Sequence, residues 1–351
     1  MPLIAHSNLP SFKRLQQEGE VVLSKDRANS QVIRELHIGL LNMMPDAALE
    51  ATERQFFRLI GRSNQIAQFY LHPFTLSSIE RGEKAQAHID AHYLDFNEIK
   101  TQGLDALIVT GAPVKEADLE KEPFYQQLKE VIEWSYDHVT STLCSCLATH
   151  AVLEFRYGQK RQPMEKKCWG VFPHQVQDRI HPLVNDVNTQ FDVPHSRYNE
   201  ISKAQFDKAG VKILADSEIG AHLCVSEDLL RIVFFQGHPE YDTISLLKEY
   251  KREVIAYLAK IRDDYPPFPE HYLCVQSKAI LNEFKTKVLV GDLQISDFPE
   301  ILVDQTLCNT WQNTSLAVIN NWIGCVYQVT HEEVGKPFME GTDPNDPLGL
   351  K

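Results

Sequence analysis

The sequence lacks the features that define several common classes of protein. Among its 351 residues, no apolar run reaches the roughly 18 residues that a membrane-spanning helix requires. The seven cysteines are scattered and contain no pair of C-x-x-C motifs, which argues against a structural zinc site. No cleavable signal opens the chain, because residues 1–6 are followed at once by polar residues. We therefore expect a soluble cytoplasmic protein with reduced thiols and no membrane partner.

Positive charge is also scarce in this chain. Lysine and arginine together number 35 against 48 acidic residues, so the formal net charge is −13. Nucleic acid and anionic membranes are therefore poor partners. An anionic ligand such as a coenzyme A (CoA) thioester would need a local basic patch that works against the overall charge.

The chain alternates apolar runs with segments of helical periodicity. This alternation predicts an α/β fold with a doubly wound, mostly parallel sheet and flanking helices, whose ligands gather at the carboxyl ends of the strands. Residues 1–35 are expected to form an N-terminal arm, 36–262 an α/β domain, and 263–351 a C-terminal extension packed on the same domain. Strands are expected at 36–44, 65–75, 104–113, 139–143 and 229–236, and helices at 47–61, 125–138, 147–157 and 243–261.

A cysteine stands where one predicted strand turns into a helix. The run from Val139 to Leu143 is followed by Cys144-Ser145-Cys146, and helical periodicity then continues to Gly158. Backbone amides at a helix N-terminus favour a thiolate and can bind an oxyanion, so this position suits a nucleophile. The alternative is a small apolar side chain in a buried strand.

A second turn supplies the groups that a cysteine nucleophile needs. His238 ends an apolar run, Pro239 stops it, and Glu240 follows two residues after the histidine. A base of this kind would take the thiol proton, and the carboxylate would orient the imidazole. Each residue alone could be a solvated turn residue, but together with Cys146 they favour a catalytic triad.

Beyond these two turns, further motifs are spread along nearly the whole chain. They lie at 40–45, 53–59, 107–113, 133–143, 146–148, 194–198, 237–242, 321–322 and 326–328. Together these segments resemble the homoserine O-acyltransferases of the succinyltransferase type, which act early in methionine synthesis. The resemblance implies a class I glutamine-amidotransferase-like fold, a Cys-His-Glu triad and a homodimer.

The resemblance also implies a reaction and a set of site residues. In the expected ping-pong reaction an acyl group passes from acyl-CoA to the enzyme and then to the hydroxyl of homoserine, with no metal and no bound cofactor. Lys167 and Arg252 would be read as solvated charges without the resemblance. The implied roles are Cys146 as nucleophile, His238 as base, Glu240 as its partner, Lys167 and Ser196 as substrate contacts, Arg252 as the α-carboxylate clamp, and the amides of Val114 or Lys115 and of Leu147 as the oxyanion hole.

Several positions depart from the family pattern. Lys115 occupies the position that sorts acyl donors; its bulk favours acetyl, whereas its charge favours succinyl, which we slightly prefer. The family's Met-Pro-Lys-Lys is here Met44-Pro45-Asp46-Ala47, and an insertion is expected at about 275–305. Such changes keep open a serine O-acyltransferase of cysteine biosynthesis, because serine is only one methylene shorter than homoserine.

Other interpretations of the cysteine turn carry less support. A glutamine amidohydrolase usually has glycines on both sides of the nucleophile, whereas Cys146 has Cys144 and Ala148 at these places. A non-catalytic protein that keeps this fold would have no need of an intact triad. Cys144 is a rival nucleophile, and Cys168 is interpreted as structural.

Overall fold

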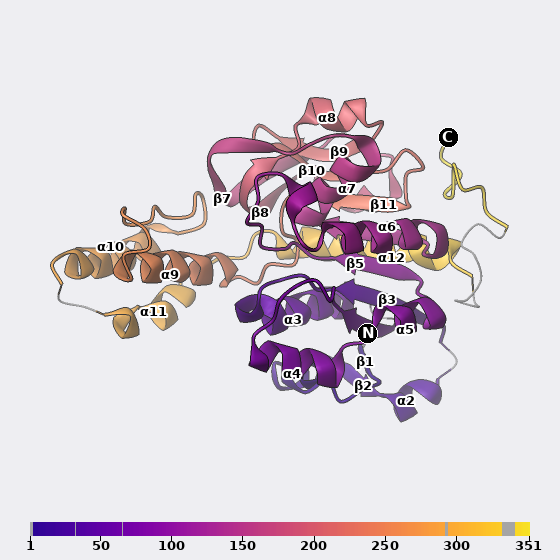
Figure 1. Cartoon of the computed structure of the whole chain (residues 1–351), viewed down its shortest axis with the longest axis horizontal. Helices are drawn as coiled ribbons and strands as arrows, with labels where there is room; N and C mark the ends of the chain where they lie inside the picture. Colours follow the sequence, from indigo (N-terminus) through magenta and orange to yellow (C-terminus); the bar gives the residue numbers. More distant parts are fainter. Residues whose placement is uncertain (1–2, 32, 65, 292–293, 332–340) are drawn as a thin grey trace.

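The computed structural model describes residues 3–31, 33–64, 66–291, 294–331 and 341–351. Over this part of the chain the strands form one 11-stranded sheet in the order β2-β1-β4-β3-β5-β6-β11-β10-β9-β7-β8 (Figure 1). The strands are β1 (Leu3–Ala5), β2 (Val22–Ser24), β3 (Glu35–Leu41), β4 (Gln68–Phe74), β5 (Ala106–Val109), β6 (Ser141–Ser145), β7 (Gln162–Val176), β8 (Gln190–Glu200), β9 (Lys212–Ser217), β10 (Gly220–Val225) and β11 (Ile232–Phe235).

The sheet has a parallel part and an antiparallel part. All neighbours from β2 to β11 in the sheet order pair in parallel, whereas β10, β9, β7 and β8 pair antiparallel. The parallel strands β3, β4, β5 and β6 are buried along nearly their whole length because helices cover both of their faces. The expected doubly wound, mostly parallel α/β fold is confirmed.

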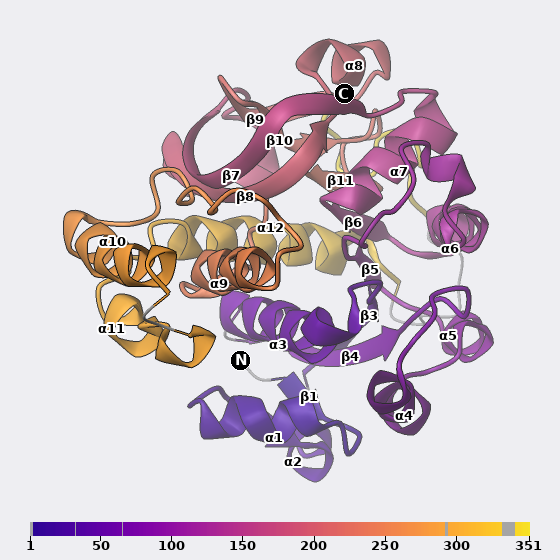
Figure 2. The same cartoon turned by 60° about the vertical axis from the view of Figure 1, so that its left-hand side comes forward.

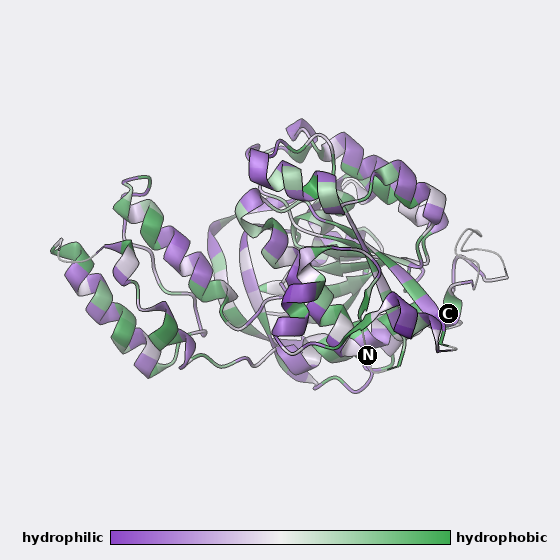
Figure 3. Ribbon diagram, turned by 90° about the horizontal axis from the view of Figure 1, so that it is seen from below, coloured by the Kyte–Doolittle hydropathy of each residue, from purple (hydrophilic) through white to green (hydrophobic). Residues whose placement is uncertain are grey.

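Helices lie on both faces of this sheet. The α-helices are α1 (Pro10–Gln17), α2 (Lys25–Asn29), α3 (Asp46–Ser63), α4 (Glu83–His92), α5 (Phe96–Gln102), α6 (Tyr125–His138), α7 (Leu147–Tyr157), α8 (Lys203–Lys208), α9 (Ser245–Leu258), α10 (Val275–Leu289), α11 (Glu300–Asp304) and α12 (Gln312–Val329). Short 3-10 turns occupy Leu119–Lys121, Pro182–Val184 and Ile295–Asp297. Apolar residues gather in the strands at the centre of the body, and hydrophilic residues gather on the outer helices (Figure 3).

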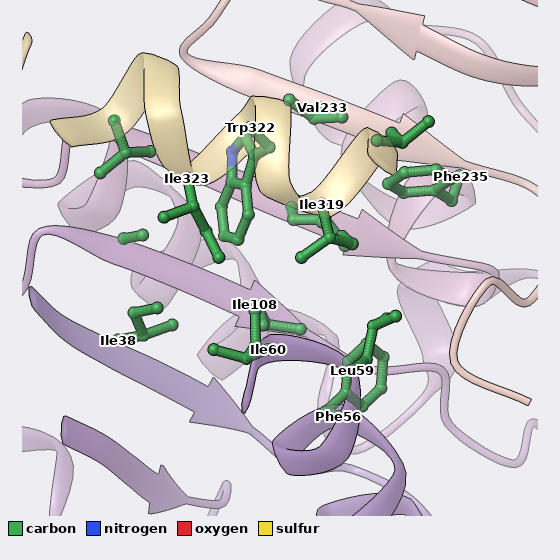
Figure 4. Close-up of a cluster of buried hydrophobic side chains, with 14 of the residues drawn as sticks. Ile38, Phe56, Leu59, Ile60, Ile108, Val233, Phe235, Ile319, Trp322 and Ile323 are labelled. Carbon is green, nitrogen blue, oxygen red and sulfur yellow. The ribbon is translucent and has the colours of Figure 1, made fainter. Parts of the chain in front are cut away.

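One core cluster joins α3 and α12 to the sheet. Ile319, Trp322 and Ile323 of α12 point toward Ile60 of α3 and Ile108 of β5 (Figure 4). The indole nitrogen of Trp322 donates a hydrogen bond to Ser141 Oγ at 2.8 Å, so the one polar atom of this buried ring has a partner. The helix at 312–329 is therefore part of the central core. A second cluster on the other face packs α5, α6 and α7 against the same strands.

The N-terminal and C-terminal segments of the chain differ from the arm and the extension that the sequence predicts. In the N-terminal segment, β1 and β2 extend the sheet in parallel beyond β4, so this segment belongs to the sheet itself. The segment after 263 divides in two. α10 and α11 lie with α9 in a helical projection at one side of the body, whereas α12 returns to the sheet (Figures 1 and 2).

Four of the five predicted strands are shorter in the structure, namely those expected at 36–44, 65–75, 104–113 and 229–236. The strand expected at 229–236 begins only at Ile232, because Leu229 takes a φ of 70° and Asp228 accepts the amides of Leu230 and Arg231 in a tight turn. The strand expected from Gln65 begins at Gln68, and Gln65 itself lies outside the described residues. No helix in the described part of the chain is long and apolar enough to cross a membrane.

Candidate active site

Cys146 lies in a strained turn between β6 and α7. It is the N-cap of α7 with φ 51° and ψ −108°, a backbone conformation that non-glycine residues rarely adopt. Its amide donates to Phe235 O of the neighbouring strand at 2.8 Å, and Thr149 Oγ1 bonds to both Cys144 O and Phe235 O at 2.9 Å. These bonds hold the turn open at the carboxyl ends of β6 and β11, with the thiol only partly buried.

His238 and Glu240 follow β11 at the same edge of the sheet. His238 Nδ1 lies 2.8 Å from Glu240 Oε1, and the His238 amide donates to Pro194 O at 2.8 Å. The Tyr241 ring stacks on the imidazole with a centroid distance of 4.3 Å. Because Nδ1 is bonded to the carboxylate, Nε2 is the ring nitrogen that is left to exchange a proton with the Cys146 thiol.

The charges around His238 favour its imidazolium form. Burial lowers the pKa of His238, but the negative charges of Glu240 and of the Cys146 thiolate outweigh it, and the pKa lies well above its ordinary value. A cation between two anions is the arrangement that a thiolate–imidazolium pair requires. The structure thus brings Cys146, His238 and Glu240 together in one constellation.

The proposed substrate contacts share a hollow with Cys146 and His238. The hollow has a volume of about 450 Å³, and its wall includes Cys146, His238, Lys167, Ser196 and Arg252. The first part of α3 also lines the hollow, mostly with small side chains: Ala47, Ala48, Ala51, Thr52 and Gln55. A larger hollow of about 620 Å³ lies against Phe172 and Asp216 on the antiparallel strands, away from the thiol.

Glu249 is a site residue that the sequence patterns did not point out. Its buried carboxylate accepts hydrogen bonds from Ser196 Oγ at 2.6 Å, Tyr241 OH at 2.6 Å and Trp169 Nε1 at 2.8 Å, and lies 3.5 Å from Lys167 Nζ. Burial raises the pKa of Glu249, but the Lys167 charge and these bonds outweigh it and the pKa is lowered.

The Glu249 carboxylate therefore links the proposed substrate contacts Lys167 and Ser196 to the tyrosine that stacks on His238. A sequence signal was available for this residue. Glu249 lies three positions before Arg252 on α9, and residues at this spacing share a helix face.

The amides expected to form the oxyanion hole differ in whether they already have a hydrogen-bond acceptor. The Lys115 amide donates to the buried Glu122 carboxylate at 2.5 Å, and the Lys115 side chain is exposed outside the hollow. Leu147 is the first residue of α7, so its amide has no acceptor within the helix. The amides of Leu147 and Val114 remain the better candidates for an oxyanion hole.

The altered loop before α3 has its own local partners. Asp46 is the first residue of α3, and its carboxylate accepts the Gly82 amide at 2.8 Å and lies 3.3 Å from Arg81. Arg81 also donates to Met44 O at 2.5 Å. The aspartate that stands where the family has lysine is thus used to fix the loop, and Met44 and Pro45 remain on the wall of the hollow.

The remaining cysteines near the turn do not compete with Cys146. Cys144 is fully buried in β6, and burial raises the pKa of its thiol far above the ordinary range. Cys168 is buried as well, and burial raises its pKa. A thiol that resists ionisation is a poor nucleophile, so both cysteines are structural residues.

Comparison with known proteins shows the family of this chain. The family model described as homoserine O-succinyltransferase matches residues 2–332. The chain belongs to the homoserine O-succinyltransferase family. Relatives of that name from Thiobacillus denitrificans and Nitrosococcus oceani are 61% and 59% identical; each match covers 100% of this chain, and 100% and 99% of the respective relative.

A solved glutamine amidotransferase from Thermotoga maritima is a distant structural neighbour. It has a TM-score of 0.42 and 11% identity over 84% of this chain and 98% of its own. Membership of the homoserine O-succinyltransferase family rests on the full-length sequence matches, and it identifies the chain as an enzyme of methionine biosynthesis.

Proposed function

We propose that this enzyme transfers a succinyl group from succinyl-CoA to the hydroxyl of homoserine through an acyl-enzyme on Cys146. The observation that carries the proposal is the strained Cys146 turn facing the His238–Glu240 pair in a hollow that also contains Lys167, Lys248 and Arg252. The cations would bind the anionic substrates, and the triad would carry the acyl group. The cytoplasm is the expected compartment, because the donor and the reduced thiol belong there.

In the first half-reaction, the Cys146 thiolate attacks the thioester carbonyl of the donor. A new carbon–sulfur bond forms, the bond to CoA breaks, and the departing CoA thiolate takes the proton held by the His238 imidazolium. The amides of Leu147 and Val114 would stabilise the oxyanion on the way. Glu240 holds the imidazole in the orientation that this transfer needs.

In the second half-reaction, the neutral imidazole of His238 removes the hydroxyl proton of homoserine. The hydroxyl oxygen attacks the acyl carbonyl, the bond to Cys146 breaks, and the thiolate–imidazolium pair is restored. Arg252 would bind the α-carboxylate with its two-pronged guanidinium. Ser196 and Lys167, both held by Glu249, would contact the amino acid.

A two-step assay tests the proposed function. Purified enzyme is incubated with succinyl-CoA alone, and we expect CoA release together with a mass increase of one succinyl group on Cys146. Homoserine is then added, and we expect O-succinylhomoserine with recovery of the unmodified enzyme. Acetyl-CoA as a faster donor, serine as a better acceptor, or CoA release only when both substrates are present would each contradict a part of the proposal.

A further inference from the structure

Two cations of the active-site hollow lie free on one face of α9. The hollow contains Lys167, Lys248 and Arg252, although the chain as a whole has a net charge of −13. Lys167 lies 3.5 Å from the Glu249 carboxylate. Within the described residues, the side chains of Lys248 and Arg252 form no ion pair, and both are exposed. Lys248 and Arg252 are four residues apart on the helix, so their side chains are neighbours. Their positive charges repel each other until an anion binds between them.

Lys248 lies where this hollow meets a second one. The second hollow has a volume of about 360 Å³ and shares Gln55, Tyr241 and Lys248 with the first. Cys146 lines only the first hollow. Lys248 therefore lies at the rim, on the path from the thiol into the second hollow.

The acidic groups of the second hollow are largely engaged by other cations. Glu18 and Asp242 each lie 2.5 Å from Arg58, and Glu240 is bonded to His238. The fourth acid, Asp304, forms no ion pair within the described residues. Lys248 itself lies within ion-pair distance of no carboxylate in the described residues, so its charge is available to a ligand. An ammonium on a flexible stem suits a phosphate group, which it binds as a point charge.

We propose that Lys248 binds a phosphate of the CoA part of the acyl donor. The inference rests on the proposed function and deepens it. The carboxylate of a succinyl group on Cys146 extends only about 4 Å beyond the thioester carbonyl, by ordinary bond lengths. The phosphates, by contrast, lie at the far end of the long pantetheine arm and must leave the hollow at its rim. Lys248 would then serve the first half-reaction, and Arg252 the second.

The experiment compares two donors on variants of one exposed lysine. Lys248→Gln and Lys248→Glu are assayed for acyl-enzyme formation with succinyl-CoA and with succinyl-pantetheine, which lacks the nucleotide phosphates. At low salt we expect kcat/KM for succinyl-CoA to fall about tenfold in Lys248→Gln and further in Lys248→Glu. With succinyl-pantetheine we expect both variants to match the unchanged enzyme. Raising the salt concentration should weaken succinyl-CoA use by the unchanged enzyme more than by Lys248→Gln.

A lysine elsewhere provides the control. Lys278 is exposed on α10 and lines neither hollow, so Lys278→Gln should leave both donors unaffected. An equal loss with both donors would overturn the proposal, because Lys248 would then serve the acyl group or the chemistry. Unchanged kinetics with succinyl-CoA would overturn it too. Neither result touches the proposed function, which fails only if no donor acylates Cys146.

Discussion

The antiparallel strands and the parallel strands each carry a hollow, and the larger hollow lies away from the proposed catalytic residues. On the antiparallel strands, a hollow of about 620 Å³ has Lys203 and Asp216 in its wall, 2.5 Å apart, each neutralising the other. At the carboxyl ends of the parallel strands, a hollow of about 450 Å³ holds a strained cysteine, a histidine with raised pKa and unpaired cations. Unbalanced charge and backbone strain, and not the volume of the hollow, therefore support the proposed site.

Removing the thiol gives the largest expected effect. Cys146→Ala should lower the overall rate by at least about 10³-fold, because no acyl-enzyme can form. The measurement is CoA release from succinyl-CoA together with the intact mass of the protein. Cys274→Ser is the matched control, since Cys274 is an exposed cysteine at the start of α10. A succinyl group on any other cysteine of the Cys146→Ala variant would contradict the assignment.

Replacing the buried carboxylate of Glu249, which bonds the proposed substrate contacts, should give the second-largest loss of activity. Glu249→Gln leaves Lys167 without its charge partner, and we expect kcat/KM for homoserine to fall about 10- to 100-fold. CoA release from succinyl-CoA should fall much less, because this step depends on Cys146 and His238. Glu253→Gln, on the same helix but paired with Arg262, serves as the control. Equal losses in both half-reactions would show that Glu249 acts on the triad instead.

Acid should weaken the fold on the antiparallel side. His174, His195 and His222 form a buried cluster, and burial lowers the pKa of His174 to about 4 and those of the other two well below the ordinary value. Below the unfolded pKa of about 6.5 the unfolded chain binds protons that the folded protein excludes. The stability contributed by each histidine is therefore complete above about pH 6.5 and falls as the pH drops toward 4.

Urea unfolding at pH 7 and pH 5 measures this effect. Each of the three histidines should account for about 1.4 kcal/mol per pH unit of lost stability, and His174→Phe should remove one such contribution while keeping the ring stacked on His195. The exposed His138 is the control, since His138→Gln should leave the pH slope unchanged. Equal stability at the two pH values would refute the assignment.

The smallest effect is expected in the larger hollow. Lys203→Ala breaks a partly exposed ion pair with Asp216, which should change the free energy of unfolding by about 0–1 kcal/mol and the activity by less than about twofold. Thermal unfolding and a steady-state assay check both values. A large loss of activity would mean that the antiparallel hollow takes part in the reaction. The two hollows would then not differ in function as proposed.

Local patterns were enough to predict much of the fold and to propose the triad that the structure brings to one edge of the sheet. Cys146 between a strand and a helix, and His238 with Glu240 two positions later, are short-range features that the chain order of an α/β sheet brings to one edge. The three-residue strands β1 and β2 were missed because such short segments carry no readable periodicity. The bond between the Lys115 amide and Glu122 was missed because it depends on how a loop folds back on itself.

The amino-acid sequence alone determined the family and the α/β class, and it was enough to propose the triad, because strand-turn-helix order and a few short motifs encode them. Only the tertiary structure decided which charges are paired and which are free. Glu249 neutralises Lys167 and Asp46 fixes Arg81, whereas Lys248 and Arg252 stay without partners in the described part of the chain. Charge pairing depends on distances between residues remote in sequence, and these distances exist only once the helices have packed on the sheet.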